Sequence, residues 1–168
     1  RRMASDPKIS RSSLLRYHAC VKAASDDAWL TEGQWDDLAV TVPDGGAFIA
    51  DGTQVDLGAD GSRVHDTTVV AWACRMPSGK IRVDCRIFAA AKDAVHHELA
   101  VGAHGQIDYT RIEDFIVEQC ERFVVKEAAF DPTYLDRSAD HLVDELPDTA
   151  VFPVQPGSAH YREALTVL

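Results

Sequence analysis

The feature that most constrains the fold is the order of two hydrophobic patterns along the chain. From Thr53 onward, the strand pattern with its period of two residues occurs three times before the helical pattern with its period of 3.6 residues appears. Three stretches of strand character, Thr53–Asp60, Thr67–Cys74 and Lys80–Phe88, are separated only by short turns. Strands joined by such turns lie antiparallel to one another as neighbours in a sheet. Helical and strand periods then alternate, which is typical of strands that run parallel with helices between them. The sequence therefore predicts an α/β protein with a mixed sheet flanked by helices.

The alternating half begins with a predicted helix over Tyr109–Phe123, where Thr110 and Glu113 have the spacing of a capping box. A strand over Val124–Phe130 follows and ends at Asp131-Pro132. The remaining stretches predict a helix, a short strand and a last helix, over Tyr134–Leu146, Ala150–Val154 and Ser158–Leu168. An irregular insertion over Ala89–Gln106 precedes this half. The resulting order, β-β-β-α-β-α-β-α, is that of ribonuclease H.

The N-terminal part predicts a helical lead-in rather than part of the sheet. A helix is expected over Ser10–Ala24, and Trp29 and Trp35 follow in an acidic segment that suggests packing against a neighbour. A Pro-Asp-Gly-Gly turn then breaks the chain as a domain boundary would. We therefore expect a lead-in or linker over residues 1–45 and a sheet domain over residues 46–168.

Charge and composition limit the partners and the compartment. The chain has 17 Lys+Arg against 27 Asp+Glu and a net charge of −10, whereas DNA-binding domains are usually basic. An acidic enzyme can still act on DNA if divalent metals mask its carboxylates and another part of the molecule grips the duplex. No stretch reaches the roughly 18 apolar residues of a membrane span, and the first residues hold no signal-peptide core. We expect a cytoplasmic protein with no membrane partner.

The metal-binding and redox side chains show no structural-zinc pattern. Four scattered cysteines form no C-x-x-C pair. Cys74 and Cys85 lie in apolar strand-like runs, where a thiol is expected to be a small buried hydrophobe. His96, His97 and His104 fit no zinc spacing. Neither a disulfide framework nor a zinc site is expected.

Two aspartates end predicted strands and carry the functional prediction. Asp60 ends the first strand, and Asp131 ends the fourth. If these strands are adjacent and parallel, both carboxylates point into one crevice, where α/β proteins bind ligands. Two like charges held together need a cation, and carboxylates favour Mg²⁺ or Mn²⁺. Asp at a strand end is also common simply because it caps turns and helices, so that alternative stays open.

These positions carry a family resemblance. Gly58-Ala-Asp60-Gly-Ser62-x-x-x-Asp66-Thr-Thr-Val resembles the G-x-D-x-S-x-x-x-D-x-T-A signature that opens the nuclease domain of phage terminase large subunits. The apolar strand before Asp131-Pro132 looks like a second element of that family. Gln155-Pro156-Gly157 is similar to its "Q-G, then helix" element, and residues 15–38 look like the segment that leaves its motor domain. The resemblance spans the chain from about Leu15 onward.

The resemblance implies a ribonuclease H-like fold and a metal-dependent endonuclease that cuts concatemeric double-stranded DNA during viral genome packaging in the host cytoplasm. Asp60 would be the metal-bridging acid and Asp131 the second ligand of a two-metal Mg²⁺ or Mn²⁺ site. Asp66 would either reach the metal or brace the turn, and Ser62 is expected to satisfy turn backbone. The family also implies portal protein and the small terminase subunit as partners.

Two departures from the family pattern limit what is carried over. The family has a further acidic metal ligand on a downstream helix that has no counterpart before Leu168. No G-x-x-x-x-G-K-[ST] phosphate loop occurs, so no ATP site is expected in this chain. We therefore expect a nuclease domain truncated at its C-terminal end, with its activity in isolation left open.

Two other functions fit the same pattern. An Asp-Gly-Ser turn between strands also resembles the phosphate-holding hairpin of actin-like ATPases and sugar kinases, although those prefer Asp-x-Gly-Thr and carry a second hairpin. A non-catalytic acidic docking module is the other alternative, and wide separation of Asp60 and Asp131 would favour it. His65, in the turn beside Asp60, could contact a phosphate or a metal, or it could be a solvated loop residue. Arg63, Arg137 and Arg162 would contact phosphate if they line the crevice, and otherwise they are ordinary surface arginines.

Overall fold

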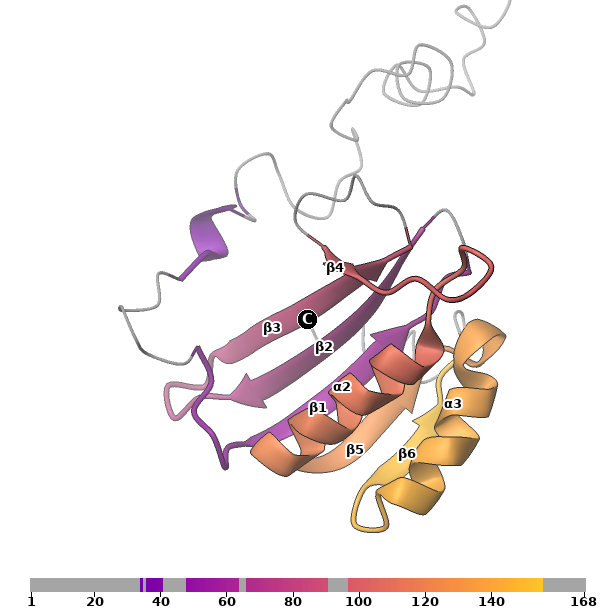
Figure 1. Ribbon diagram of the computed structural model, residues 1–168. Coiled ribbons are helices and arrows are strands. Elements are labelled where there is room, and N and C mark those ends of the chain that lie inside the picture. Colours follow the sequence, from indigo (N-terminus) through magenta and orange to yellow (C-terminus); the bar gives the residue numbers. More distant parts are fainter. Residues whose placement is uncertain (1–33, 35, 41–47, 64–65, 91–96, 156–168) are drawn as a thin grey trace, which may run out of the picture. The chain divides into compact units, whose positions relative to one another are not determined.

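The protein is described by a computed structural model that places residues 34, 36–40, 48–63, 66–90 and 97–155 (Figure 1). The chain divides into two units, residues 1–46 and 47–168. The described part of the first unit contains the short 3-10 helix η2 (Asp36–Leu38). The expected helices over Ser10–Ala24 and Ser158–Leu168, together with Trp29 and Trp35, lie outside the described residues.

Within the described part of the second unit, six strands form one mixed sheet in the order β4-β3-β2-β1-β5-β6. Their bounds are β1 (Gln54–Asp60), β2 (Thr67–Arg75), β3 (Ile81–Ala89), β4 (Glu98–Leu99), β5 (Val124–Phe130) and β6 (Ala150–Pro153). β1, β2 and β3 form an antiparallel meander, whereas β5 runs parallel to β1 and β6 runs parallel to β5. The predicted mixed sheet is confirmed.

The predicted irregular insertion contains the short strand β4, which pairs parallel with the end of β3 at one edge of the sheet. An isolated bridge between Val101 and Ile107 closes the loop that follows. A strand of two residues is too short to show a hydrophobic period, so the sequence pattern could not reveal β4.

Two helices, α2 (Tyr109–Arg122) and α3 (Pro132–Glu145), pack against the same face of the sheet (Figure 1). Alternate strand residues and helix residues three or four apart meet in this layer, as the two periodicities require. Fully buried members of the core include Val55, Val70, Phe88, Phe130, Ile112, Ile116, Leu135 and Leu142. No helix in the described part of the chain is both long enough and apolar enough to cross a bilayer.

The start of α2 differs from the predicted capping box. Asp108 is the N-cap, and its side chain accepts a hydrogen bond from the backbone nitrogen of Thr110 at 3.2 Å. Thr110 therefore lies inside the first turn, and its predicted pairing with Glu113 as a capping box is wrong. Asp caps helices as well as Thr does, so the sequence allowed both starts.

The opposite face of the sheet carries apolar side chains that neither α2 nor α3 covers. On β3, Ile81 and Val83 are 51% and 54% exposed. Cys85 alternates with them and is also exposed, so the expectation of a buried thiol is wrong for Cys85. It is right for Cys74, which faces the helices from β2. The alternation along β3 was visible in the sequence, but nothing in it showed which face the helices would cover.

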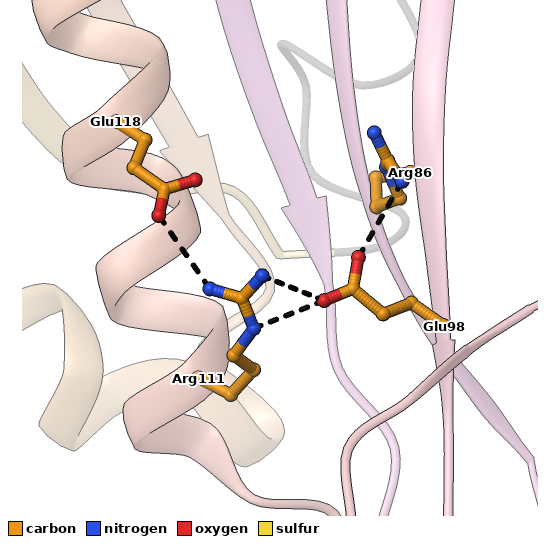
Figure 2. A network of polar contacts seen from close by, with 4 residues as sticks. All are labelled: Arg86, Glu98, Arg111 and Glu118. Atoms are coloured by element: carbon orange, nitrogen blue, oxygen red, sulfur yellow. Dashed lines mark hydrogen bonds and ion pairs between the residues drawn. The ribbon is translucent and has the colours of Figure 1, made fainter.

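An ionic network joins α2 to the sheet edge (Figure 2). Glu98 on β4 accepts hydrogen bonds from Arg111 on α2, with nitrogen–oxygen distances of 2.8 and 2.9 Å. Arg86 on β3 and Glu118 on α2 extend the network, each through a contact of 3.5 Å. The arginine side chains are 40% and 52% exposed, so each pair stabilises the fold only modestly. The network orients β4 against the helix.

Candidate functional site

Asp60 and Asp131 lie at matching ends of neighbouring parallel strands. In the β1–β5 register Ala59 is opposite Phe130, so the next residue of each strand is an aspartate. The backbone nitrogen of Asp131 donates to the carbonyl oxygen of Ala59 at 3.1 Å, which continues the ladder to the last residue. The predicted adjacency of these strands is confirmed, and two aspartates 71 positions apart in the chain are thereby brought together.

The electrostatics of Asp60 reflect this closeness. Burial is the main cause that raises the pKa of Asp60, followed by the negative charge and the hydrogen-bonding side chain of Asp131. Asp66 adds a smaller repulsion, and a hydrogen bond from the backbone of Gly61 acts in the opposite direction. Both effects of Asp131 need the two carboxyl groups to be near neighbours. A cation between them would remove the repulsion.

Asp131 is also the N-cap of α3. Its Oδ1 accepts hydrogen bonds from the backbone nitrogen of Thr133 at 3.0 Å and from Thr133 Oγ1 at 2.8 Å. Pro132 follows at the first helical position, where its missing N–H costs nothing. The capping alternative from the sequence is therefore correct for Asp131. Both of these hydrogen bonds use Oδ1, so the cap does not involve Oδ2.

Asp66 lies near enough to repel Asp60, but its hydrogen bonds are within its own turn. Its Oδ1 accepts from the backbone nitrogen of Thr67 at 2.8 Å, and its carbonyl oxygen accepts from Ser62 Oγ at 2.9 Å. Ser62 is 5% exposed, and its backbone nitrogen donates to Thr68 Oγ1 at 3.0 Å. Of the two roles left open for Asp66, these contacts favour bracing the turn. Ser62 satisfies turn backbone, as expected.

Two tyrosines that the sequence reasoning missed lie around the aspartate pair. Tyr109, the first residue of α2, donates from its hydroxyl to the carbonyl oxygen of Ser62. Its pKa is raised, mainly by burial and also by Tyr134, Asp60 and Asp131. Tyr134 lies in the first turn of α3 and is 48% exposed. No spacing rule connects a helix start with a strand end 49 positions earlier, so only the structure reveals this neighbourhood.

A hollow of about 410 Å³ opens beside the pair. Its floor contains a row of small residues in register across three strands, because Gly58 on β1 is paired with Ala71 on β2 and with Ala129 on β5. The full lining is Gly58, Ala59, Asp60, Val69, Ala71, Ala129, Phe130, Asp131 and Val154. Among the described residues, the two carboxylates are the only charged groups in this lining, so a ligand in the hollow would meet negative charge at one end and apolar side chains below it.

The donor set fits one shared divalent cation. Mg²⁺ is commonly held by one or two carboxylates, with water and substrate phosphate completing its six ligands. Among the described residues, no group of three or more His, Cys, Asp or Glu side chains is arranged to hold a metal ion. Asp60 and Asp131 therefore suit a single cation, and a second ion would need ligands from substrate or from residues outside the described ranges.

The other predicted site residues are only partly placed. Arg63 and Arg137 are exposed, and neither lines the hollow. His65, His96 and Arg162 lie outside the described residues. The wide separation of Asp60 and Asp131 that would have favoured a docking module is not found.

Comparisons of the chain with protein-family models, with curated proteins and with solved structures found no match. A functional assignment therefore depends on the geometry of the aspartate pair and on the motifs around it.

Proposed function

We propose that this chain is a metal-dependent DNA endonuclease domain of a viral genome-packaging terminase, with a ribonuclease H-like fold. The observation that supports it most is the meeting of Asp60 and Asp131 at the ends of adjacent parallel strands, beside an open hollow. The sheet order is compatible with a ribonuclease H-like arrangement, because the antiparallel meander continues through β1 into parallel strands. The signature-like motif spans residues 58–69, and within it residues 58–60 form the end of β1 and residues 67–69 form the start of β2.

The chemistry proposed for this site is hydrolysis of a phosphodiester bond. Bound Mg²⁺ or Mn²⁺ would supply Lewis acidity and a more acidic bound water at neutral pH. Asp60 and Asp131 would hold the cation, and the α3 cap would fix the orientation of Asp131. The turn between β1 and β2 is held by Ser62, Thr68 and Tyr109, so it keeps Asp60 at the rim of the hollow. The hollow would receive the backbone of the DNA strand.

The net charge of −10 limits how this domain can bind DNA. A cation at the pair neutralises the two carboxylates closest to the scissile phosphate, but it leaves the rest of the surface acidic. We therefore propose that the grip on double-stranded DNA comes from other parts of the packaging machine. Portal protein and the small terminase subunit are the proposed partners, and binding by this domain alone should be weak and sensitive to salt.

Nicking of supercoiled plasmid in the presence of Mn²⁺ tests the proposal. The wild type is compared with Asp60→Asn and Asp131→Asn, which remove one charge each and keep the shape of the side chain. Asp56→Asn is the matched control, because Asp56 is an exposed carboxylate four positions earlier on β1. We expect the wild type and the control to nick the plasmid, and both site variants to fall to the level seen with EDTA. Equal cleavage by wild type and Asp60→Asn would overturn the nuclease proposal.

The same proteins distinguish the proposed nuclease from the nucleotide-binding alternative. A phosphate-holding hairpin would bind Mg-ATP in the absence of DNA, which calorimetry detects directly. The proposed nuclease should show no such binding, because the turn at Gly61-Ser62 lacks the Asp-x-Gly-Thr pattern that those families prefer.

A further inference from the structure

The turn after β1 touches the first turn of α3 at Gly61. A Cβ atom placed on Gly61 would lie 3.0 Å from Tyr134 Cβ and 3.0 Å from Leu135 Cγ. Carbon atoms in favourable contact are about 3.5–4.0 Å apart, so a methyl group here would crowd both atoms and fit only if α3 or the turn shifted. Gly61 is not among the glycines with a positive φ. Its lack of a side chain therefore provides space for the helix rather than an unusual backbone conformation.

Neither neighbour of Gly61 can move aside by itself. Leu135 is fully buried in the core beneath α3, so its side chain has no free space to rotate into. The Tyr134 contact is made by its Cβ atom, which is fixed to the helix backbone. A larger residue at position 61 would therefore displace the first turn of α3 as a unit, by a few tenths of an ångström.

The displaced turn is the one that holds Asp131. The Asp131 carboxylate accepts two hydrogen bonds from Thr133, so it must follow the turn. The backbone nitrogen of Asp131 stays bonded to Ala59 on β1, and Asp60 is the next residue along that strand. A shift of α3 therefore changes the position of the Asp131 carboxylate relative to Asp60 while the sheet stays in place.

We infer that the first turn of α3 positions the Asp131 carboxylate for a small divalent cation shared with Asp60. This turn can take its position because it packs against Gly61, which has no side chain. This inference rests on the proposed cation site and adds a positioning role for Gly61 and Thr133. Mg²⁺ requires nearly ideal octahedral ligands at about 2.0–2.1 Å, whereas Ca²⁺ accepts flexible geometry at about 2.3–2.6 Å. A misplaced Asp131 should therefore weaken Mg²⁺ binding more than Ca²⁺ binding.

The test measures cation affinity in four proteins: wild type, Gly61→Ala, Thr133→Val and Leu142→Val. Free Mn²⁺ is followed by electron paramagnetic resonance, and Mg²⁺ and Ca²⁺ are measured by their displacement of bound Mn²⁺. Thr133→Val removes the Oγ1 donor to Asp131 from an exposed position, so it should fold whether or not Gly61→Ala does. Leu142→Val is the matched structural control, because it weakens the buried packing of α3 about three turns away from the cap.

We expect Gly61→Ala to lower Mn²⁺ affinity by about tenfold or more, as the loss of an outer support of a metal ligand typically does. Thr133→Val should act in the same direction, and both variants should shift the preference from Mg²⁺ towards Ca²⁺. Leu142→Val should lower thermal stability without changing either quantity. A purely structural role for the first turn would give all three variants the same unchanged affinity and cation preference in their folded state.

The outcomes separate this inference from the proposed function. The positioning role alone is overturned if Asp60→Asn loses Mn²⁺ binding while both Gly61→Ala and Thr133→Val keep the wild-type affinity and the wild-type preference for Mg²⁺. Absence of Mn²⁺ binding to the wild type, or equal binding by Asp60→Asn, overturns the cation site and this inference together.

Discussion

The ionised form of Asp60 is disfavoured, because burial and the charge of Asp131 both raise its pKa. In EDTA, Asp60→Asn removes that repulsion and should raise the melting temperature by about 1–3 °C, given the modest size of partly exposed charge interactions. Adding Mn²⁺ should then stabilise the wild type and leave the variant unchanged. Differential scanning fluorimetry with both additions checks this, and a Mn²⁺-induced shift of equal size in the variant would count against the shared site.

The thiol of Cys85 offers a test of the exposed face of the sheet. Although Cys85 is exposed, partial shielding of its thiol from water first and the charge of Asp84 second raise its pKa above the ordinary cysteine value. Because the thiolate is the reactive form, alkylation by iodoacetamide should be slow at pH 7 and should accelerate as the pH rises past 9. Asp84→Asn should move this rise to lower pH, while buried Cys74 stays unmodified in the native protein.

Mass spectrometry of the alkylated peptides follows each cysteine separately. Modification of Cys74 at the rate of Cys85 would show that the layer between β2 and the helices opens readily, contrary to the packing described.

At the same scale, the sequence identified the aspartates but not their surroundings. Asp60 and Asp131 were predictable because each directly follows a run of strand residues, and strand ends share an edge. Tyr109 and Thr133 were not, since their roles come from helix starts whose positions in space depend on the packing of α2 and α3. Gly61 appeared in the sequence only as a turn residue, whereas the structure shows it as a contact point for α3.

At the scale of elements, α3 allows the structural and chemical roles of Asp131 to be separated. Asp131→Asn keeps an N-cap acceptor and removes a charge from the cation site. Relief of the repulsion with Asp60 should offset the lost charge at the helix start, so stability should be nearly unchanged. Asp131→Ala removes the cap as well and should cost about 1 kcal/mol of unfolding free energy. Urea unfolding in EDTA measures the difference. Equal loss of stability in both variants would mean that charge at the helix start, rather than hydrogen bonding to Thr133, provides the cap.

The elements themselves were largely predictable, and for a physical reason. The meander strands and the helices α2 and α3 are long enough to show a clear period of two or of 3.6 residues. The edge strand β4 is too short for any period, and its place depends on long-range contacts such as that between Glu98 and Arg111. Which side of β3 would be buried also depended on the docking of the helices, so Cys85 was assigned to the wrong environment.

At the scale of the whole molecule, we expect self-association through the face of β3 that α2 and α3 leave exposed among the described residues. Val83→Lys should cost less than about 0.5 kcal/mol, because the side chain is 54% exposed, and it should reduce association at high concentration. Urea unfolding and light scattering measure the two effects. A large loss of stability would instead show that another part of the chain packs on this face.

The central claim is that Asp60 and Asp131 jointly hold a divalent cation, and its most direct test is the stoichiometry of Mn²⁺ binding. Equilibrium titration followed by electron paramagnetic resonance is applied to the wild type, Asp60→Asn, Asp131→Asn and the control Asp56→Asn. We expect a bound ion in the wild type and the control, and its loss in each of the two site variants. Retention of that ion by either site variant at wild-type affinity would contradict the claim.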